Sequence, residues 1–164
     1  MKILPDIYVS RITDIAIDVL TGKGIKGIAI DIDNTLTADG SFYIDEAISI
    51  WLNSVKNTGI SFCIVSNNHP PRVEPFATQI GMQYICEARK PRKDCKEQLL
   101  EMLNFKPDEV VMIGDQIFTD VYFAKKCGFY SILLDPIAED KHRGAAIKRF
   151  FERPLKYFLR KRRL

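Results

Sequence analysis

Two kinds of hydrophobic pattern alternate along the chain. Five short runs are almost continuously apolar and rich in β-branched residues, which is typical of strands buried on both faces. We predict strands at 25–31, 60–66, 82–86, 109–114 and 129–135. Apolar residues recur at helical spacing between them, at 44–58, 71–81, 92–104 and 117–127. This alternation predicts an α/β fold: a three-layer, Rossmann-like domain with a central five-stranded parallel sheet and helices on both faces.

Polar side chains follow directly after four of the predicted strands. They are Asp31 and Asp33, then Ser66, Asn67 and Asn68, then Lys90, and finally Asp115 and Asp120. In an open parallel sheet, ligands bind outside the carboxyl ends of the strands. We therefore expect these side chains to meet at one edge of the sheet.

Four carboxylates in one cleft repel each other strongly at short range unless a cation lies between them. Oxygen ligands favour Mg²⁺, so Asp31, Asp33, Asp115 and Asp120 are the predicted metal site. A lysine, a hydroxyl and the N–H groups of a turn suit phosphate oxygens, and Lys90, Ser66 and Asn67 supply them.

These residues predict phosphoryl transfer through a covalent aspartyl phosphate. Asp31 would attack phosphorus, while Asp33 would protonate the leaving alkoxide and later take a proton from water. Mg²⁺ would be held by Asp31, the backbone carbonyl of Asp33, and Asp115. Each motif alone has an ordinary explanation as a turn or a solvated surface, but their order after successive strands favours catalysis. An EF-hand is excluded because Leu36 stands where that loop requires glycine.

The 164 residues, 1–164, fit a single domain. The first residues do not resemble a secretory signal, and no run approaches the roughly 18 apolar residues of a membrane span. The four cysteines form no C-x-x-C pair and predict reduced, buried thiols in a cytoplasmic protein. The two histidines, His69 and His142, are isolated, which argues against a histidine metal site.

The net charge of +3 is concentrated at the C-terminus. Residues 148–164 contain eight Lys or Arg and one Glu, so the rest of the chain is acidic overall. Apolar residues of the tail, 147–164, follow helical spacing, and they are Ile147, Phe150, Phe151, Leu155, Phe158 and Leu159. This pattern fits an amphipathic helix at an anionic membrane, a helix packed on the core, or a segment that binds nucleic acid.

The motifs "DIDNTL", "SNN", "RKP" and "GDQIFTD" resemble the four motifs of the haloacid dehalogenase (HAD) superfamily and stand in the same order. The resemblance implies that Asp31 is the nucleophile, Asp33 the acid and base, and Ser66 and Lys90 the phosphate ligands. It implies that Asp115 binds the metal and that Asp120 supports it through water or Lys90. The gaps between the motifs are too short for a cap domain, so we expect a capless (class III) member.

The stretches "ILPDIYV", "IVSNN" and "VMIGDQIFTDV" are similar to the YqeG family of capless HAD phosphatases. That family is similar to phosphatidylglycerophosphate phosphatases, which implies an anionic phospholipid substrate and a location at the inner face of the membrane. Two alternatives remain: a phosphatase for a soluble or nucleic-acid phosphomonoester, and a non-catalytic module associated with RNA or the ribosome. The oligomeric state is left open by the sequence.

Overall fold

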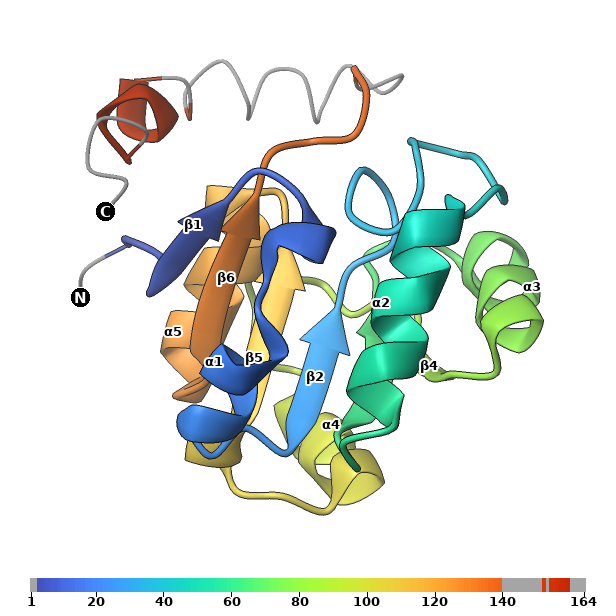
Figure 1. Ribbon diagram of the computed structural model, residues 1–164, viewed down its shortest axis with the longest axis horizontal. Helices are drawn as coiled ribbons and strands as arrows, with labels where there is room; N and C mark the ends of the chain where they lie inside the picture. The colour runs from blue at the N-terminus through green and yellow to red at the C-terminus, as the bar shows by residue number, and fades with distance from the viewer. Residues whose placement is uncertain (1–2, 140–151, 153, 160–164) are drawn as a thin grey trace.

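A six-stranded, all-parallel sheet forms the middle layer of the protein (Figure 1). The computed structural model describes residues 3–139, 152 and 154–159. The strands are β1 (Ile7–Val9), β2 (Gly27–Ile30), β3 (Ser61–Val65), β4 (Gln83–Ile85), β5 (Val110–Gly114) and β6 (Tyr130–Leu134). Their order across the sheet is β1-β6-β5-β2-β3-β4, so β2 lies at the centre, between β5 and β3.

The sheet has one strand more than the predicted five. The additional strand is β1, which pairs in parallel with β6 at the edge, with Ile7 opposite Ile132. The prediction was wrong here because Asp6 and Ser10 confine the apolar run to three residues, whereas the run around β4 extends from Met82 to Cys86. The other five strands lie within the predicted ranges.

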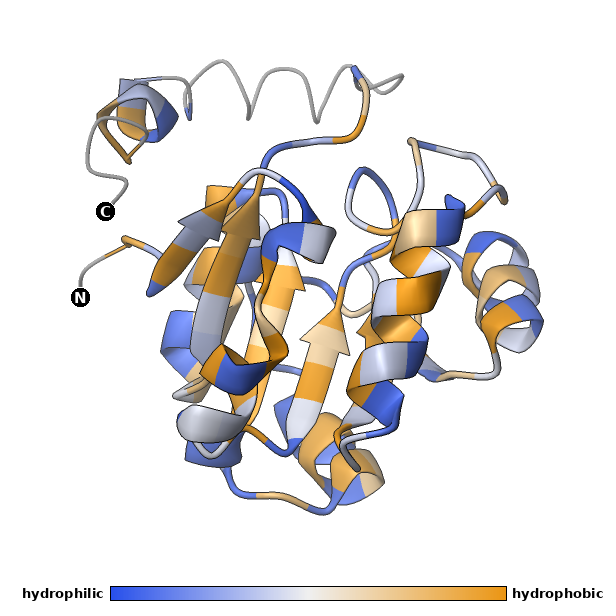
Figure 2. Cartoon of the chain, viewed as in Figure 1, coloured by the Kyte–Doolittle hydropathy of each residue, from blue (hydrophilic) through white to orange (hydrophobic). Residues whose placement is uncertain are grey.

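Helices cover both faces of the sheet and form the outer layers (Figure 1). One face carries α1 (Ile17–Gly22), α2 (Glu46–Lys56) and α3 (Pro70–Ile80), and the other carries α4 (Lys96–Leu103) and α5 (Tyr122–Cys127). Trp51 of α2 packs in the first core, and Leu99 and Phe123 pack in the second. Figure 2 shows the strands as largely hydrophobic and the helices as a mixture of hydrophobic and hydrophilic residues. The three-layer α/β prediction is therefore confirmed.

Helix ends differ from the predicted ranges for local reasons. The side chain of Asp45 accepts a hydrogen bond from the backbone N–H of Ala47, so α2 begins at Glu46 and not at residue 44. The helix predicted at 117–127 is a π-helix, η3 (Ile117–Val121), continued by α5. Short 3₁₀ turns, η1 (Ile12–Asp14) and η2 (Pro107–Glu109), and helix α1 were not predicted.

The connections between the motif-bearing strands contain little besides one helix each. Between β2 and β3 lie a loop and α2, and between β3 and β4 lies α3. No cap domain is inserted in either connection of the described chain. The four cysteines are free thiols, and three of them are buried. Across the described residues, no helix has the length and apolar character needed to cross a membrane.

Part of the predicted amphipathic tail packs on the core. Leu155 and Leu159 contact the cluster formed by Ile117, Val121 and Leu133. Phe158, which the spacing placed on the same apolar face, is 47% exposed. The remaining apolar residues of the prediction, Ile147, Phe150 and Phe151, lie outside the described residues.

Candidate active site

The three central strands deliver the predicted site residues to one edge of the sheet. Asp31 follows the last residue of β2, Ser66 follows β3, and Asp115 follows β5. Because β3, β2 and β5 are neighbours and all parallel, their carboxyl ends lie side by side (Figure 1). The structure therefore brings together the motifs that the sequence separates by about eighty residues.

Three buried carboxylates and one buried lysine form the centre of the site. One oxygen each from Asp31, Asp115 and Asp120 lie within 4.8 Å of one another. Lys90 Nζ donates to Asp31 Oδ1 at 3.0 Å and to Asp120 Oδ1 at 2.7 Å. One lysine offsets only part of this charge, which leaves the cluster acidic.

Burial and the neighbouring charges set the protonation of the central pair. Burial raises the pKa of Asp31 to about 6, although Lys90 opposes the shift. Burial alone would lower the pKa of Lys90, but the carboxylates of Asp120 and Asp31 outweigh it and raise that pKa above its usual value. At neutral pH, Asp31 is therefore mostly a carboxylate and Lys90 a cation.

Asp120 reaches this centre because glycine precedes Asp115. A Cβ atom added to Gly114 would lie 2.3 Å from Asp120 Cγ, far inside van der Waals contact. The backbone N–H of Gln116 donates to Asp120 Oδ2 at 3.1 Å and fixes the carboxylate from the other side. The glycine of the "GDQIFTD" motif thus makes room for the ion pair between Asp120 and Lys90.

The turn after β3 holds the backbone that carries Lys90. Asn67 Nδ2 donates to the carbonyl of Lys90 at 2.9 Å, and the N–H of Lys90 donates to Asn67 Oδ1 at 2.6 Å. The side chain of Asn67, predicted to bind phosphate, is thus engaged with the lysine backbone. Ser66 is buried beside it, and its hydroxyl accepts a hydrogen bond from the N–H of Asn68 at 3.1 Å.

The side chain of Asp33, predicted as part of the metal site, does not belong to the three-carboxylate cluster and has other partners. Its Oδ1 accepts hydrogen bonds from Arg72 Nη2 at 2.7 Å and from the N–H of Gly40 at 2.9 Å. Its Oδ2 accepts one from Asn68 Nδ2 at 2.5 Å. The two aspartates of the "DID" motif therefore have separate surroundings, one facing Lys90 and the other facing Arg72.

Arg72 is a site residue that the sequence analysis did not identify. Its guanidinium lies over the rings of Phe42 and Phe76, with centroids at 4.8 and 5.2 Å. The available signal was its position in the first turn of the helix that follows "SNN", but its partner Asp33 is 39 residues away. Only the fold reveals that pair.

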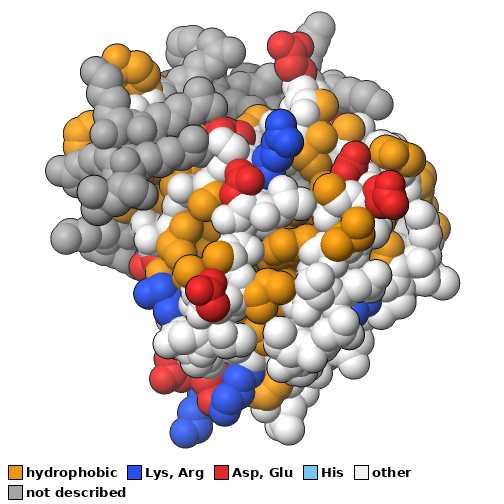
Figure 3. Space-filling view, in the orientation of Figure 1, with side chains coloured by type: hydrophobic (Ala, Val, Ile, Leu, Met, Phe, Trp, Pro, Cys, Tyr) orange, Lys and Arg blue, Asp and Glu red, His pale blue; other side chains and the backbone are white. Residues whose placement is uncertain are grey.

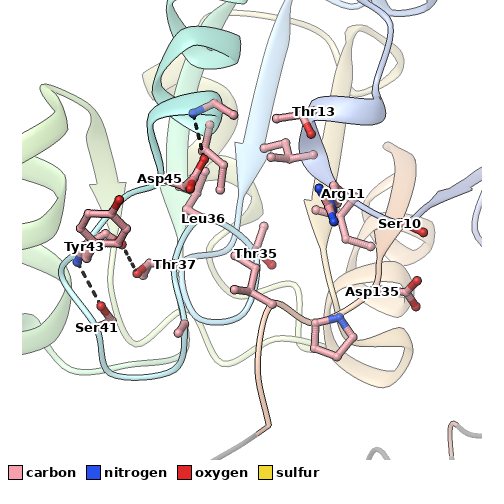
Figure 4. A pocket seen from close by; sticks show the side chains of 17 residues that line it. Ser10, Arg11, Thr13, Thr35, Leu36, Thr37, Ser41, Tyr43, Asp45 and Asp135 are labelled. Atoms are coloured by element: carbon pink, nitrogen blue, oxygen red, sulfur yellow. Dashed lines mark hydrogen bonds between the residues drawn. The ribbon is translucent and has the colours of Figure 1, made fainter.

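A cavity of about 590 Å³ adjoins the loop that follows Asp33 (Figure 4). Three segments line it: 10–13 after β1, 35–48 after β2, and 134–137 after β6. Polar side chains such as Arg11, Thr13 and Asp45 alternate there with apolar ones. The cavity includes Thr35 and Thr37 of the loop that follows Asp33, but the carboxylates of the central cluster do not line it.

The three-carboxylate cluster has the composition of a site for a hard divalent cation. All its donors are oxygens, and they lie close enough together to share one ion. Nitrogen and sulfur ligands, which softer metals prefer, do not contribute to this cluster. The donor set fits Mg²⁺.

Comparison with known proteins assigns the family. The model of the family described as mitochondrial PGP phosphatase matches residues 1–138. The protein belongs to this family. "Probable phosphatase YqeG" of Bacillus subtilis (strain 168) is 35% identical over 135 residues, covering 82% of this chain and 78% of the relative. The predicted relation to YqeG proteins and to PGP phosphatases is confirmed.

A second relative of the family is much longer. The chloroplastic and mitochondrial phosphatidylglycerophosphate phosphatase 1 of Arabidopsis thaliana is 27% identical over 170 residues. The match covers 97% of this chain and 49% of the plant protein, so the chain spans about half the length of that relative.

Solved structures agree with the fold. A protein from Listeria monocytogenes serotype 4b superposes with a TM-score of 0.60 at 18% identity, over 73% of this chain and 84% of that one. The cobalt-bound deoxy-D-mannose-octulosonate 8-phosphate phosphatase of Haemophilus influenzae gives 0.52 at 15% identity, over 68% and 69%. The family match makes the protein a phosphatase, a hydrolase of phosphoric monoesters, and these two solved structures share its fold.

Proposed function

We propose that this PGP phosphatase family member hydrolyses the terminal phosphate of phosphatidylglycerophosphate in a Mg²⁺-dependent reaction, giving phosphatidylglycerol and inorganic phosphate. The observation that carries the proposal is the buried Asp31–Lys90 pair beside Asp115 and Asp120, in a chain whose family is described by this substrate. The whole chain, 1–164, would act as one phosphatase domain.

Asp31 is proposed as the nucleophile. Its carboxylate oxygen forms a bond to phosphorus as the bond between phosphorus and the leaving alkoxide oxygen breaks. Lys90 and Ser66 bind the oxygens of the transferred group, and the turn at Asn67 holds Lys90 in place. A poor leaving group such as an alkoxide needs a proton, which Asp33 supplies.

Asp33 is proposed to act in both halves of the reaction. It donates its proton to the alkoxide and then accepts a proton from the water that attacks the aspartyl phosphate, which frees Asp31 and releases phosphate. General acid–base help of this kind contributes about 10²–10⁴-fold. Arg72 and Asn68 fix the direction of the Asp33 carboxyl group through their hydrogen bonds.

Mg²⁺ would be held by Asp31, Asp115 and the backbone carbonyl of Asp33, with Asp120 supporting the site through Lys90. When bound, the ion neutralises the negative charge shared by the nucleophile and the phosphate. This assignment explains why the chain gathers three carboxylates around a single lysine.

Contact with an anionic membrane is proposed as the way the protein meets a lipid substrate. Phe42, Tyr43 and Ile137 are 44, 73 and 49% exposed, and they lie in loops at the carboxyl ends of the strands. The basic tail, 147–164, adds positive charge that anionic head groups attract. The protein would then be cytoplasmic and peripheral at the inner face of the membrane.

A soluble or nucleic-acid phosphomonoester is the alternative substrate, and the basic tail is the observation that favours it. Figure 3 shows Lys and Arg side chains interspersed with acidic and hydrophobic ones on the face of α1 and α2. This mixture of charges does not favour binding of either a phospholipid or a nucleic acid at that face. The non-catalytic alternative is not retained, because the chain belongs to a phosphatase family.

Phosphate release from several substrates tests the proposal. Phosphatidylglycerophosphate in mixed micelles, a soluble phosphomonoester and a 3′-phosphorylated oligonucleotide are compared, each with and without Mg²⁺. We expect Mg²⁺-dependent release from the lipid to dominate and to be lost in Asp31→Asn. Phosphate release mainly from the soluble ester or the oligonucleotide would contradict the lipid substrate but would still support the proposed phosphatase mechanism.

A further inference from the structure

The C-terminal residues contact the loop that carries Asp115. Lys156 Nζ donates a hydrogen bond to the backbone carbonyl of Asp115 at 2.7 Å. Glu152 Oε1 accepts one from the backbone N–H of Phe118 at 2.9 Å. These bonds join residues 41 and 34 positions apart, so they depend on the tertiary structure and not on local sequence.

Lys156 lies on the inward face of a helical segment. Residues 154–159 are helical, and Leu155, Lys156 and Leu159 follow the spacing of one helical stripe, while Glu152 precedes them in the chain. Leu155 and Leu159 pack on Ile117, Val121 and Leu133. The opposite side carries Tyr157 and Phe158, which are 62 and 47% exposed. The inward stripe is thus directed at the Asp115 loop and the π-helix that follows it.

The segment under this stripe positions two of the three clustered carboxylates. Asp115 lies just before η3, and Asp120 lies within it. The first N–H groups of a helix have no acceptor within that helix. Glu152 supplies an acceptor for one of them, at Phe118, and is itself fully buried. Lys156 binds the carbonyl of Asp115 itself, and so restrains the peptide group next to a proposed metal ligand.

We infer that Lys156 and Glu152 are positioning residues for the divalent-cation site. They hold the backbone of 115–118, and through it they set where the carboxylate of Asp115 lies relative to Asp31 and Asp120. Groups that orient metal ligands typically change metal affinity by about 10–100-fold when they are removed. Glu152 and Lys156 are therefore part of the active-site structure, a role that rests on the proposed Mg²⁺ site but not on the proposed lipid substrate.

The test measures cation affinity directly, with Mn²⁺ as the probe and electron paramagnetic resonance as the readout, on full-length protein. Lys156→Met removes the donor and the charge while keeping the chain length. We expect it to weaken Mn²⁺ binding about tenfold. Lys156→Arg keeps a cationic donor and should restore most of the affinity. Tyr157→Ala, on the outward side of the same helix, should leave it unchanged.

A second pair of variants covers the case in which Lys156→Met does not fold. Glu152→Gln keeps an acceptor oxygen for the N–H of Phe118 and should bind Mn²⁺ like the wild type, whereas Glu152→Leu should bind it about tenfold more weakly. Thermal unfolding of each metal-free variant identifies any loss of folded protein. The same titrations, with activity on the lipid measured beside them, separate this inference from the substrate proposal.

Wild-type Mn²⁺ affinity in both Lys156→Met and Glu152→Leu would overturn the inference. A loss of Mn²⁺ affinity in Tyr157→Ala equal to that in Lys156→Met would also overturn it. A wild-type protein that binds no Mn²⁺ would overturn it together with the metal site. Cation binding that follows the expected pattern in a protein inactive on phosphatidylglycerophosphate would support it and would contradict only the proposed substrate.

Discussion

At the scale of single residues, the site depends on space as much as on charge. The ion pair between Asp120 and Lys90 forms only because Gly114 has no side chain in the way. Asp33 is held by a guanidinium that also contacts two aromatic rings. For both arrangements we predict that a single substitution should affect catalysis more than folding.

Gly114→Ala should impair catalysis. The new methyl group would meet the Asp120 side chain at 2.3 Å, so Asp120 must move away from Lys90. We expect kcat to fall by about 10²-fold, the effect of a misplacement of about 1 Å, and the free energy of unfolding to fall by about 1–3 kcal/mol from overpacking. Steady-state kinetics and urea unfolding measure the two effects.

Gly22→Ala is the matched control, because a Cβ atom there has no neighbour within 4 Å. It should keep wild-type kcat and stability. A Gly114→Ala protein with wild-type kcat would show that Asp120 does not need its observed position.

Arg72→Gln should slow the hydrolysis of alkyl phosphates more than that of aryl phosphates. The substitution removes both hydrogen bonds from the guanidinium to Asp33, at 2.7 and 3.2 Å. A mispositioned general acid matters most for an alkoxide, so we expect kcat to fall about 10–100-fold for glycerol 1-phosphate. A good leaving group such as p-nitrophenolate needs less assistance from a general acid, so kcat for its phosphate ester should fall less.

Arg72→Lys retains a cation but not the paired donors, and we expect its kcat values to lie between those of the wild type and Arg72→Gln. If Arg72→Gln slows both substrates to the same extent, Arg72 does not act through the acid step of Asp33.

At the scale of elements, Asp6 links the start of the edge strand β1 to the neighbouring strand β6 and to α5. Asp6 accepts hydrogen bonds from the N–H and the hydroxyl of Ser131, each at 2.8 Å, and pairs with Lys125 Nζ at 2.6 Å. Burial would raise the pKa of Asp6, but these bonds outweigh it and lower that pKa below its usual value. A folded-state pKa below the unfolded one means that the unfolded chain binds more protons. The stabilisation is therefore present above the unfolded pKa and is lost as the pH falls through the folded pKa.

Asp6→Asn should lower the free energy of unfolding at pH 7 by about 1–2 kcal/mol. The difference from wild type should shrink as the pH falls below about 4, where the unfolded aspartate becomes protonated. Urea unfolding between pH 3 and pH 7 measures this. Asp18→Asn, at an exposed position on α1, should give a much smaller change. A difference that stays constant with pH would mean that the charge of Asp6 does not contribute.

The sequence predicted the elements whose pattern is strong and local. The five predicted strands lie in mostly apolar runs, and the polar motifs follow four of them, so the edge that carries Asp31, Lys90 and Asp115 followed from the order of the pattern. Strand β1 was missed because Asp6 and Ser10 confine its apolar run to three residues, and its pairing with β6 is apparent only in the fold. The contacts of Arg72 with Asp33 and of Lys156 with Asp115 join distant segments, and hydrophobic spacing contains no information on them.

At the scale of the whole molecule, most of the large exposed hydrophobic side chains lie in two places. Phe42, Tyr43 and Ile137 are in loops at the carboxyl edge of the sheet, and Tyr157 and Phe158 are on the outer side of the C-terminal helix. Ile50 on α2 is the remaining one among the described residues. This distribution suits a protein that turns its active-site edge toward a membrane.

The double variant Tyr43→Ser and Ile137→Ser should bind anionic vesicles about tenfold more weakly, because exposed apolar side chains contribute about 1.5 kcal/mol or more when they are fully buried. Its activity on a short-chain, soluble substrate should change little. Co-sedimentation with phosphatidylglycerol vesicles measures the binding. Ile50→Ser, which removes a side chain that is 59% exposed elsewhere, is the control. Equal loss in the control would contradict a defined membrane-facing edge.

The most direct test of the account is a rapid-quench experiment with phosphatidylglycerophosphate labelled on its terminal phosphate. Within the first turnover in Mg²⁺, the account predicts acid-stable label on the peptide that contains Asp31, followed by labelled inorganic phosphate. The label should be absent from Asp31→Asn. Release of labelled phosphate with no preceding label on the protein, or label on a different residue, would contradict the assignment of Asp31 as the nucleophile.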